Sequence, residues 1–171
     1  MKDILKIIRV RQWTKNFFVF IPMFFGGSLF YLNDWQASAL TFIAFCLAAS
    51  AIYCLNDIID VDADRAHPVK CKRPIASGTI TIPQAYGMMT VSLLISIVLM
   101  FLLPEGHAKS ILVIIAYFVI NVAYCLRLKE YAIIDVCIIA SGFVLRILAG
   151  GYATGVHLSK WIVLMTFLLT L

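Results

Sequence analysis

Charge-free apolar runs constrain this chain more than any other feature. Four stretches contain no charged side chain at all: residues 17–32, 37–55, 85–103 and 110–126. About 20 apolar residues in a helix cross the roughly 30 Å hydrocarbon core of a bilayer. Each stretch therefore predicts a membrane-spanning helix, although the first reaches that length only if its helix begins near Trp13.

Two further apolar runs follow along the chain. A fifth span is expected at 131–149, where Asp135 and Arg146 interrupt it, and a sixth runs from Trp161 to Leu171. The sixth would cover only about 16 Å of helix, half a membrane. We therefore expect an all-α, polytopic transmembrane helical bundle with five complete spans and part of a sixth. We also expect a single domain over residues 1–171 that is truncated at its C-terminus.

The overall composition excludes a soluble nucleic-acid-binding domain. The chain is 63% hydrophobic and 13% charged, against about 45–50% apolar and about 25% charged residues in soluble domains. The chain has a net charge of +5, but it lacks the polar surface on which a nucleic-acid-binding protein would carry a basic patch. We therefore expect a membrane, and no nucleic acid, as its partner.

The five cysteines form neither a disulfide framework nor a CxxC metal site. Residues 1–16 predict an uncleaved amphipathic segment on the membrane surface.

The positive charges predict how the chain is oriented. Eleven Lys and Arg residues fall in the N-terminal segment, the 56–81 loop and the 127–130 loop, whereas the opposite side receives only Lys109 and Lys160. Because cytoplasmic loops carry the excess of positive residues, the N-terminus and both loops are expected in the cytoplasm. We therefore expect an integral protein of the inner (plasma) membrane.

An acidic cluster follows the second apolar span. Asp57, Asp60 and Asp64 stand at i, i+3 and i+7, so on one continuous helix they would project within about 60° of one another. Mg²⁺ relieves the repulsion among such carboxylates and prefers their oxygens as ligands. We predict that these three aspartates hold Mg²⁺ and that Asn56 beside them contacts the substrate. The alternative is a solvated loop that carries charges of both signs.

Basic residues follow this cluster and recur near the membrane. Lys70 and Arg73 are placed to bind phosphate oxygens. Together with Mg²⁺, these two cations would bind a diphosphate and stabilise it as a leaving group. Lys15 is a candidate phosphate-binding residue or a topology anchor. Asp135 and Arg146 are functional candidates because charges inside a span are costly, and their alternative is an ion pair that positions helices.

Separated motifs of this chain resemble the UbiA superfamily of intramembrane prenyltransferases. Asn56, Asp57, Asp60 and Asp64 match its NDxxDxxxD signature position for position. Residues 11–16 (RQWTKN), 64–78 and 124–151 are similar to its decaprenyl-phosphate phosphoribosyltransferase branch. That resemblance implies a nine-helix fold, with Tyr124 and Lys129 as further substrate-binding residues.

The resemblance also implies a reaction. In this branch, 5-phosphoribose passes from phosphoribosyl diphosphate to a polyprenyl phosphate, and diphosphate is released with the help of Mg²⁺. Other superfamily members transfer a prenyl group from a prenyl diphosphate to an aromatic or other acceptor, and the acidic motif does not separate the two reactions. A noncatalytic membrane transporter or scaffold is a third reading, which the concentration of charges at one membrane face disfavours.

Overall fold

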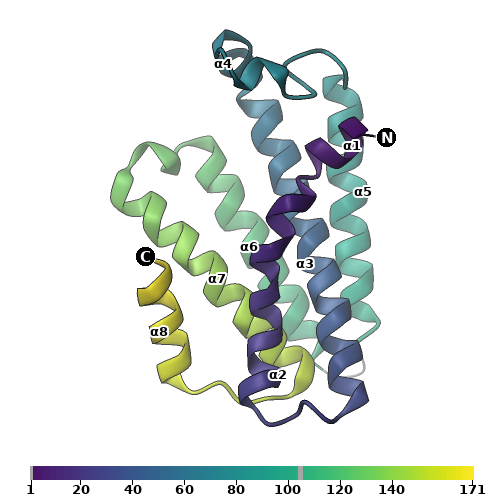
Figure 1. The fold of residues 1–171 in the computed structure, drawn as a ribbon, viewed down its shortest axis with the longest axis vertical. Helices are drawn as coiled ribbons and strands as arrows, with labels where there is room; N and C mark the ends of the chain where they lie inside the picture. The colour runs from purple at the N-terminus through teal and green to yellow at the C-terminus, as the bar shows by residue number, and fades with distance from the viewer. Residues whose placement is uncertain (1, 104–105) are drawn as a thin grey trace.

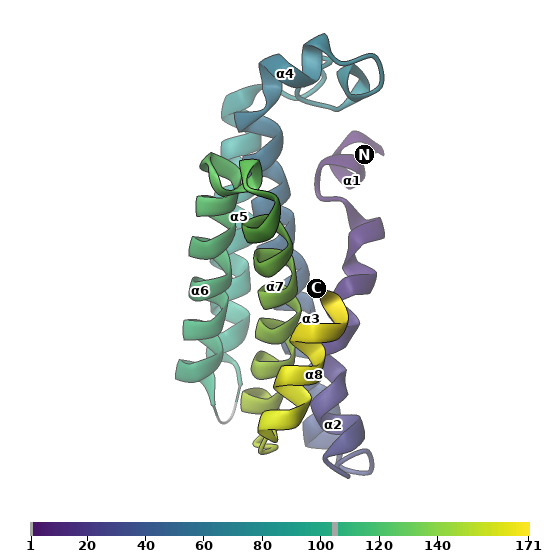
Figure 2. The ribbon, with the colours of Figure 1, turned by 90° about the vertical axis from the view of Figure 1, so that its left-hand side faces the viewer.

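The computed structural model describes residues 2–103 and 106–171, which form a bundle of helices (Figure 1). The long helices stand side by side, with short helices at one end and at the base of the bundle (Figures 1 and 2). In chain order the elements are α1 (Lys2–Ile7), η1 (Val10–Phe20), α2 (Ile21–Phe25), α3 (Leu32–Ile59), α4 (Val61–Ala66), η2 (Lys70–Lys72), α5 (Ile82–Phe101), α6 (His107–Leu126), η3 (Leu128–Glu130), α7 (Ala132–Thr154) and α8 (Lys160–Thr170).

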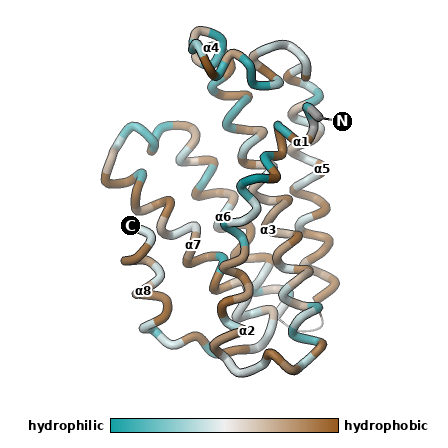
Figure 3. The backbone as a smooth tube through the Cα atoms, viewed as in Figure 1, coloured by the Kyte–Doolittle hydropathy of each residue, from teal (hydrophilic) through white to brown (hydrophobic). Residues whose placement is uncertain are grey.

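Four of these helices, α3, α5, α6 and α7, are long and apolar enough to cross a membrane. They coincide with the spans expected at 37–55, 85–103, 110–126 and 131–149, and the all-α fold class is confirmed. Polar residues gather instead around α4, above the ends of the long helices (Figure 3). The chain is therefore an integral membrane protein.

The first expected span has a different structure from the one predicted. The prediction of an α-helix there is wrong, because η1 is a 3₁₀-helix of 11 residues that is followed by only five residues of α2. A 3₁₀-helix rises about 2.0 Å per residue and an α-helix about 1.5 Å, so η1 and α2 together cover about 30 Å. That length begins at Val10 and includes Arg11 and Lys15, so the uncharged part of η1 and α2, residues 17–25, covers only about half of it.

Short-range sequence signals set several helix ends. Thr81 and Gln84 form a capping box at the start of α5, where each side chain bonds the other residue's backbone N–H. The Ser159 hydroxyl accepts a hydrogen bond from the backbone N–H of Ile162 and so caps α8. At its other end, α7 stops at Gly155, whose positive φ of 68° suits glycine.

Helix α3 forms the centre of the bundle and contacts α5, α6, α7 and η1. Its buried face is rich in small residues, among them Ala44, Ala48 and Ala49. Small side chains let membrane helices approach closely. The Ser96 hydroxyl of α5 donates a 2.8 Å hydrogen bond to the carbonyl of Ala44, which fixes the two helices together.

Helix α7 and η1 approach each other until their backbones touch. A Cβ atom on Gly150 would lie 2.0 Å from the carbonyl oxygen of Val19, so only glycine fits at this position. This contact anchors η1 directly against the helix that carries Arg146.

The N-terminal segment, which the sequence predicts to lie on the membrane surface, packs one of its apolar residues against the bundle. Ile7 is fully buried in a second apolar cluster, and Arg9 then turns the chain into η1 through a left-handed backbone conformation (φ 50°). The end of α3, the 70–80 loop and α5 contribute side chains that pack with Ile7, whereas Leu5 and Val10 of the same segment are exposed. The cluster comprises Ile7, Cys54, Ile58, Val61, Ile75, Ile80 and Ala85.

Candidate active site

The acidic cluster is divided between the end of the long helix α3 and the short helix α4. Helix α3 ends at Ile59, and Asp60 (φ −87°, ψ 7°) links it to α4. Asp57 and Asp64 are buried, whereas Asp60 is partly exposed and has different partners. The expectation that Asp57, Asp60 and Asp64 share one face of a continuous helix is therefore wrong, because the helix breaks at the middle aspartate.

Two arginines hold the buried carboxylates together. The Nη1 atom of Arg73 donates to Oδ2 of Asp64 at 2.6 Å and to Oδ1 of Asp57 at 3.1 Å. Arg9 donates from Nη2 to the same oxygen of Asp57 at 2.6 Å, and its guanidinium lies 4.8 Å from the centroid of the Tyr53 ring. Asp57 and Asp64 thus converge on a single cationic nitrogen.

Asp60 belongs to a second polar group beside the first. Its Oδ1 accepts a 2.5 Å hydrogen bond from Lys129 Nζ, and its Oδ2 accepts one from the Asn56 side chain at 3.2 Å. The Cys125 thiol in turn donates to Asn56 Oδ1 at 3.6 Å. These contacts join the end of α3 to α6 and η3 and bring the predicted residues Asn56 and Lys129 to one place.

A magnesium ion fits part of the predicted ligand set. Among the described residues, no three His, Cys, Asp or Glu side chains converge on one point, so the three-aspartate cage is not assembled. Asp57 and Asp64 do converge, and Asp57 Oδ2 and Asp64 Oδ1 accept no hydrogen bond from the part of the chain that the structure describes. Mg²⁺ in phosphate-handling sites is commonly held by one or two carboxylates together with substrate phosphates and waters. The donor set fits that mode of binding.

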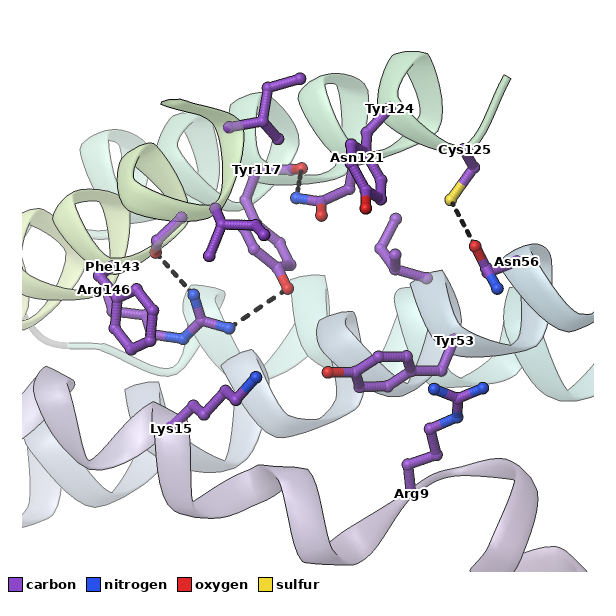
Figure 4. A pocket seen from close by; sticks show the side chains of 14 residues that line it. Arg9, Lys15, Tyr53, Asn56, Tyr117, Asn121, Tyr124, Cys125, Phe143 and Arg146 are labelled. Carbon is purple, nitrogen blue, oxygen red and sulfur yellow. Dashed lines mark hydrogen bonds between the residues drawn. The ribbon is translucent and has the colours of Figure 1, made fainter. Parts of the chain in front are cut away.

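A cavity of about 310 Å³ opens beside these carboxylates and extends among η1, α3, α6 and α7 (Figure 4). Within the described part of the chain, each charged side chain that lines it is cationic: Arg9, Lys15 and Arg146. Tyrosines, asparagines and aliphatic side chains complete the wall. The site therefore combines carboxylates at one end with a cationic interior. The other lining residues are Ile52, Tyr53, Asn56, Tyr117, Asn121, Tyr124, Cys125, Ile138, Ile139, Gly142 and Phe143.

Arg146 is the most deeply buried charge in this cavity, with 6% of its surface exposed. Its Nε donates to Asn16 Oδ1 at 2.6 Å, its Nη1 to the Gly142 carbonyl at 2.7 Å and its Nη2 to the Tyr117 hydroxyl at 3.3 Å. A guanidinium has five N–H donors, so two remain. Its guanidinium also lies 5.1–5.7 Å from the ring centroids of three aromatic residues: Phe45, Tyr117 and Phe143.

None of these contacts neutralises the charge of Arg146. Each of its three hydrogen-bond acceptors is uncharged, and in the described residues it has no salt bridge to a carboxylate. A buried charge without a counter-ion is costly. The arrangement is therefore suited to an anionic ligand that uses the two remaining donors.

The other predicted residues take different positions. Lys15 and Tyr124 line the cavity, from η1 and α6 respectively (Figure 4). Lys70 is exposed on η2 and forms no ion pair with the described residues. Asp135 stands in the first turn of α7, outside the cavity lining, and its buried Oδ1 accepts no hydrogen bond from the described residues.

Sequence reasoning missed Arg9, Tyr117 and Asn121 as site residues. Tyr117 and Asn121 could have been found from the sequence. Together with Tyr124 they stand at i, i+4 and i+7, so the three residues share one face of α6. Arg9 had no such signal, because its contact with Asp57 joins segments that are far apart in the sequence.

The chain is similar to several curated proteins over almost its whole length. It is 40% identical over 163 residues to the decaprenyl-phosphate phosphoribosyltransferase of Corynebacterium glutamicum, a match that covers 94% of this chain and 49% of that protein. It is also 40% identical over 169 residues to the protein of the same name in Mycolicibacterium smegmatis, with 96% and 52% coverage. The chain thus spans about half the length of the curated relatives it matches.

Solved structures and a family model agree on the fold. A UbiA homologue from Archaeoglobus fulgidus bound to DMAPP and Mg²⁺ superposes with a TM-score of 0.82 at 22% identity, over 98% of this chain and 60% of that one. A structure of digeranylgeranylglyceryl phosphate synthase superposes with a TM-score of 0.79 at 24% identity, over 99% and 57%. The model of the UbiA prenyltransferase family matches residues 19–171. From Val19 to Leu171, therefore, this chain belongs to the UbiA prenyltransferase family.

Proposed function

We propose that the protein transfers 5-phosphoribose from phosphoribosyl diphosphate to a polyprenyl phosphate and releases diphosphate. The observation that carries this proposal is Arg146, a buried cation with two spare donors in a cavity that continues from the carboxylate cluster. The names of the relatives from Corynebacterium glutamicum and Mycolicibacterium smegmatis support the same reaction.

The distribution of charge favours a donor with anionic groups at both ends. Phosphoribosyl diphosphate carries a diphosphate on one side of its ribose and a phosphate on the other. The diphosphate suits the carboxylate end, where magnesium would bind, and the 5-phosphate suits Arg146 and Lys15 in the interior. A prenyl diphosphate would instead place an uncharged hydrocarbon chain beside these two cations.

The chain's own residues would share the work as follows. Asp57 and Asp64 would hold the magnesium ion, which supplies charge neutralisation to the leaving diphosphate. Arg73 and Arg9 lie within hydrogen-bonding distance of these carboxylates and are placed to bind the diphosphate oxygens. Asp60 acts through Lys129, because their 2.5 Å contact holds the ammonium group at a carboxylate whose other oxygen bonds Asn56 on the cavity wall.

Binding and positioning would account for most of the catalysis. Arg146 fixes the phosphate end of the donor, so the anomeric carbon is held in the cavity between the two anionic groups. The lipid phosphate is already an anionic nucleophile when it reaches this carbon. A strong general base is therefore not needed, and Tyr124 on the cavity wall orients the substrates.

The two substrates also fit the proposed orientation in the inner membrane. The N-terminal segment, the 56–81 loop and the 127–130 loop carry eleven of the 14 Lys and Arg residues and are assigned to the cytoplasm. A water-soluble donor would enter from that side. The polyprenyl phosphate would enter from the bilayer, between the apolar helices.

Prenyl transfer to an aromatic acid is the second candidate, because of the three aromatic rings around Arg146. These rings and the guanidinium would suit an aromatic carboxylate as well as a phosphate.

An assay of diphosphate release by the purified protein with Mg²⁺ separates the two reactions. We expect release with phosphoribosyl diphosphate plus polyprenyl phosphate, together with a phosphoribosylated lipid. Release only with a prenyl diphosphate plus an aromatic acid would refute the proposal.

A further inference from the structure

A second cavity lies at the end of the bundle opposite the carboxylates. It has a volume of about 670 Å³ and is formed by the first turn of α6, the last turns of α7, the 155–159 loop and the start of α8. These elements lie at the base of the bundle in Figures 1 and 2. The proposed transfer reaction uses none of the residues that line this cavity.

Basic side chains from separate helices meet in this cavity. Lys109 and His107 come from α6, His157 from the loop, and Lys160 from the first turn of α8. The two lysines are the same two that the charge bias assigns to the non-cytoplasmic side. Because positive residues are scarce on that side of membrane proteins, their convergence on one cavity indicates an anionic ligand.

The backbone holds this cavity in a defined shape. A Cβ atom on Gly106 would lie 2.0 Å from the carbonyl oxygen of Tyr152, so the start of α6 is pressed against α7. The ammonium of Lys109 lies 5.6 Å from the centroid of the Tyr152 ring, a cation–π contact that orients it. No side chain among the described residues caps the first turn of α6, so the positive end of that helix also favours an anion.

Apolar side chains complete the cavity and point to the kind of anion. Leu148, Leu158 and Val163 line it together with the basic residues. On α8, beside the cavity, Trp161 and Leu164 are exposed, as is typical of side chains that contact lipid. A free inorganic anion would make no use of this apolar wall. The glycerol and the first acyl carbons of a lipid would cover it.

We propose that this cavity binds the headgroup of an anionic phospholipid from the non-cytoplasmic leaflet. The phosphate diester lies between Lys109 and Lys160, with the histidines as further donors, and the acyl chains follow the apolar surface of α8. This site is separate from the proposed active site. Its ligand would be a resident lipid and not a substrate.

Native mass spectrometry of the purified protein tests this proposal, with dioleoyl phosphatidylglycerol and dioleoyl phosphatidylcholine as probes. We expect phosphatidylglycerol to bind more tightly, and Lys109→Gln or Lys160→Gln to weaken its binding about fivefold each, the factor expected for one lysine near a charged headgroup. Phosphatidylcholine binding should not change. Lys6→Gln is the matched control, because Lys6 is exposed in α1, bonded to Asp3 at 2.9 Å and remote from this cavity.

Three results would overturn the proposal. Equal binding of the two lipids would show that the cavity does not select an anionic headgroup. An equal loss of phosphatidylglycerol binding in Lys6→Gln would show that only net charge matters. Full displacement of phosphatidylglycerol by inorganic phosphate would identify the ligand as a free anion. Each result leaves the transferase proposal untouched, since transfer activity is not the readout.

Discussion

Replacement of Arg146 is the mutation whose effect can be worked out most fully from the geometry of the site. Three of the five guanidinium donors bond Asn16, Gly142 and Tyr117, which leaves two for a ligand phosphate. A hydrogen bond to a charged group contributes about 1.5–3 kcal/mol. Two such bonds contribute at least about 3 kcal/mol, so Arg146→Met should raise the KM for phosphoribosyl diphosphate about 100-fold or more.

The stability of this variant should change much less than its KM. Arg146→Met leaves the Asn16 carbonyl oxygen buried without its donor, which costs about 1–3 kcal/mol, but it also removes an uncompensated buried charge. The two effects oppose each other, and we expect a small fall in Tm. Arg146→Lys, which keeps the charge without the guanidinium fork, should have an intermediate KM.

Steady-state kinetics with radiolabelled phosphoribosyl diphosphate, paired with thermal denaturation in detergent, measure both quantities. Arg65→Met is the matched control, since Arg65 pairs with Asp62 on the exposed side of α4. Its KM should match that of the wild type. An unchanged KM in Arg146→Met, accompanied by a large fall in Tm, would refute the reasoning and identify Arg146 as a purely structural residue.

Three further predictions test the metal site and the packing. Asp57→Asn should lower kcat at least about 100-fold, because a charge at the metal site is lost without a change in side-chain shape. The helix content measured by circular dichroism should be retained. Near-normal turnover would contradict the role of Asp57. Chelation with EDTA should abolish activity and added Mg²⁺ should restore it, and full activity in EDTA would exclude a metal requirement. Gly150→Ala should destabilise the protein by about 1–3 kcal/mol in a denaturation assay, because its Cβ would lie 2.0 Å from the Val19 carbonyl oxygen. Gly87→Ala, which meets open space, is the control and should have little effect.

The fold was largely predictable because membrane spans depend on local composition. Each of α3, α5, α6 and α7 covers most of an apolar run that the sequence shows directly. The 3₁₀ conformation of η1 was not predictable, since contacts distant in sequence accompany it. Asn16 bonds Arg146 and Cys46, and the Val19 carbonyl contacts Gly150. No local pattern in residues 10–20 reports those partners.

The candidate site was predictable in its residue types but not in its pairing. The spacing of the carboxylates indicated Asp57, Asp60 and Asp64, and the family resemblance indicated Lys129. In the structure Asp57 and Asp64 pair with Arg73, whereas Asp60 pairs with Lys129. The helix breaks at Asp60, and that carboxylate pairs with Lys129, a residue of η3 that is distant in the sequence. Arg9 lacked any signal for the same reason, because its partner Asp57 lies on another helix.

A structure of the protein with bound phosphoribosyl diphosphate and Mg²⁺ tests the central claim most directly. We expect the 5-phosphate within hydrogen-bonding distance of Arg146 and Lys15, with the diphosphate and metal beside Asp57 and Asp64. A 5-phosphate outside the cavity, with Arg146 bonded only to Asn16 and its other protein acceptors, would contradict it.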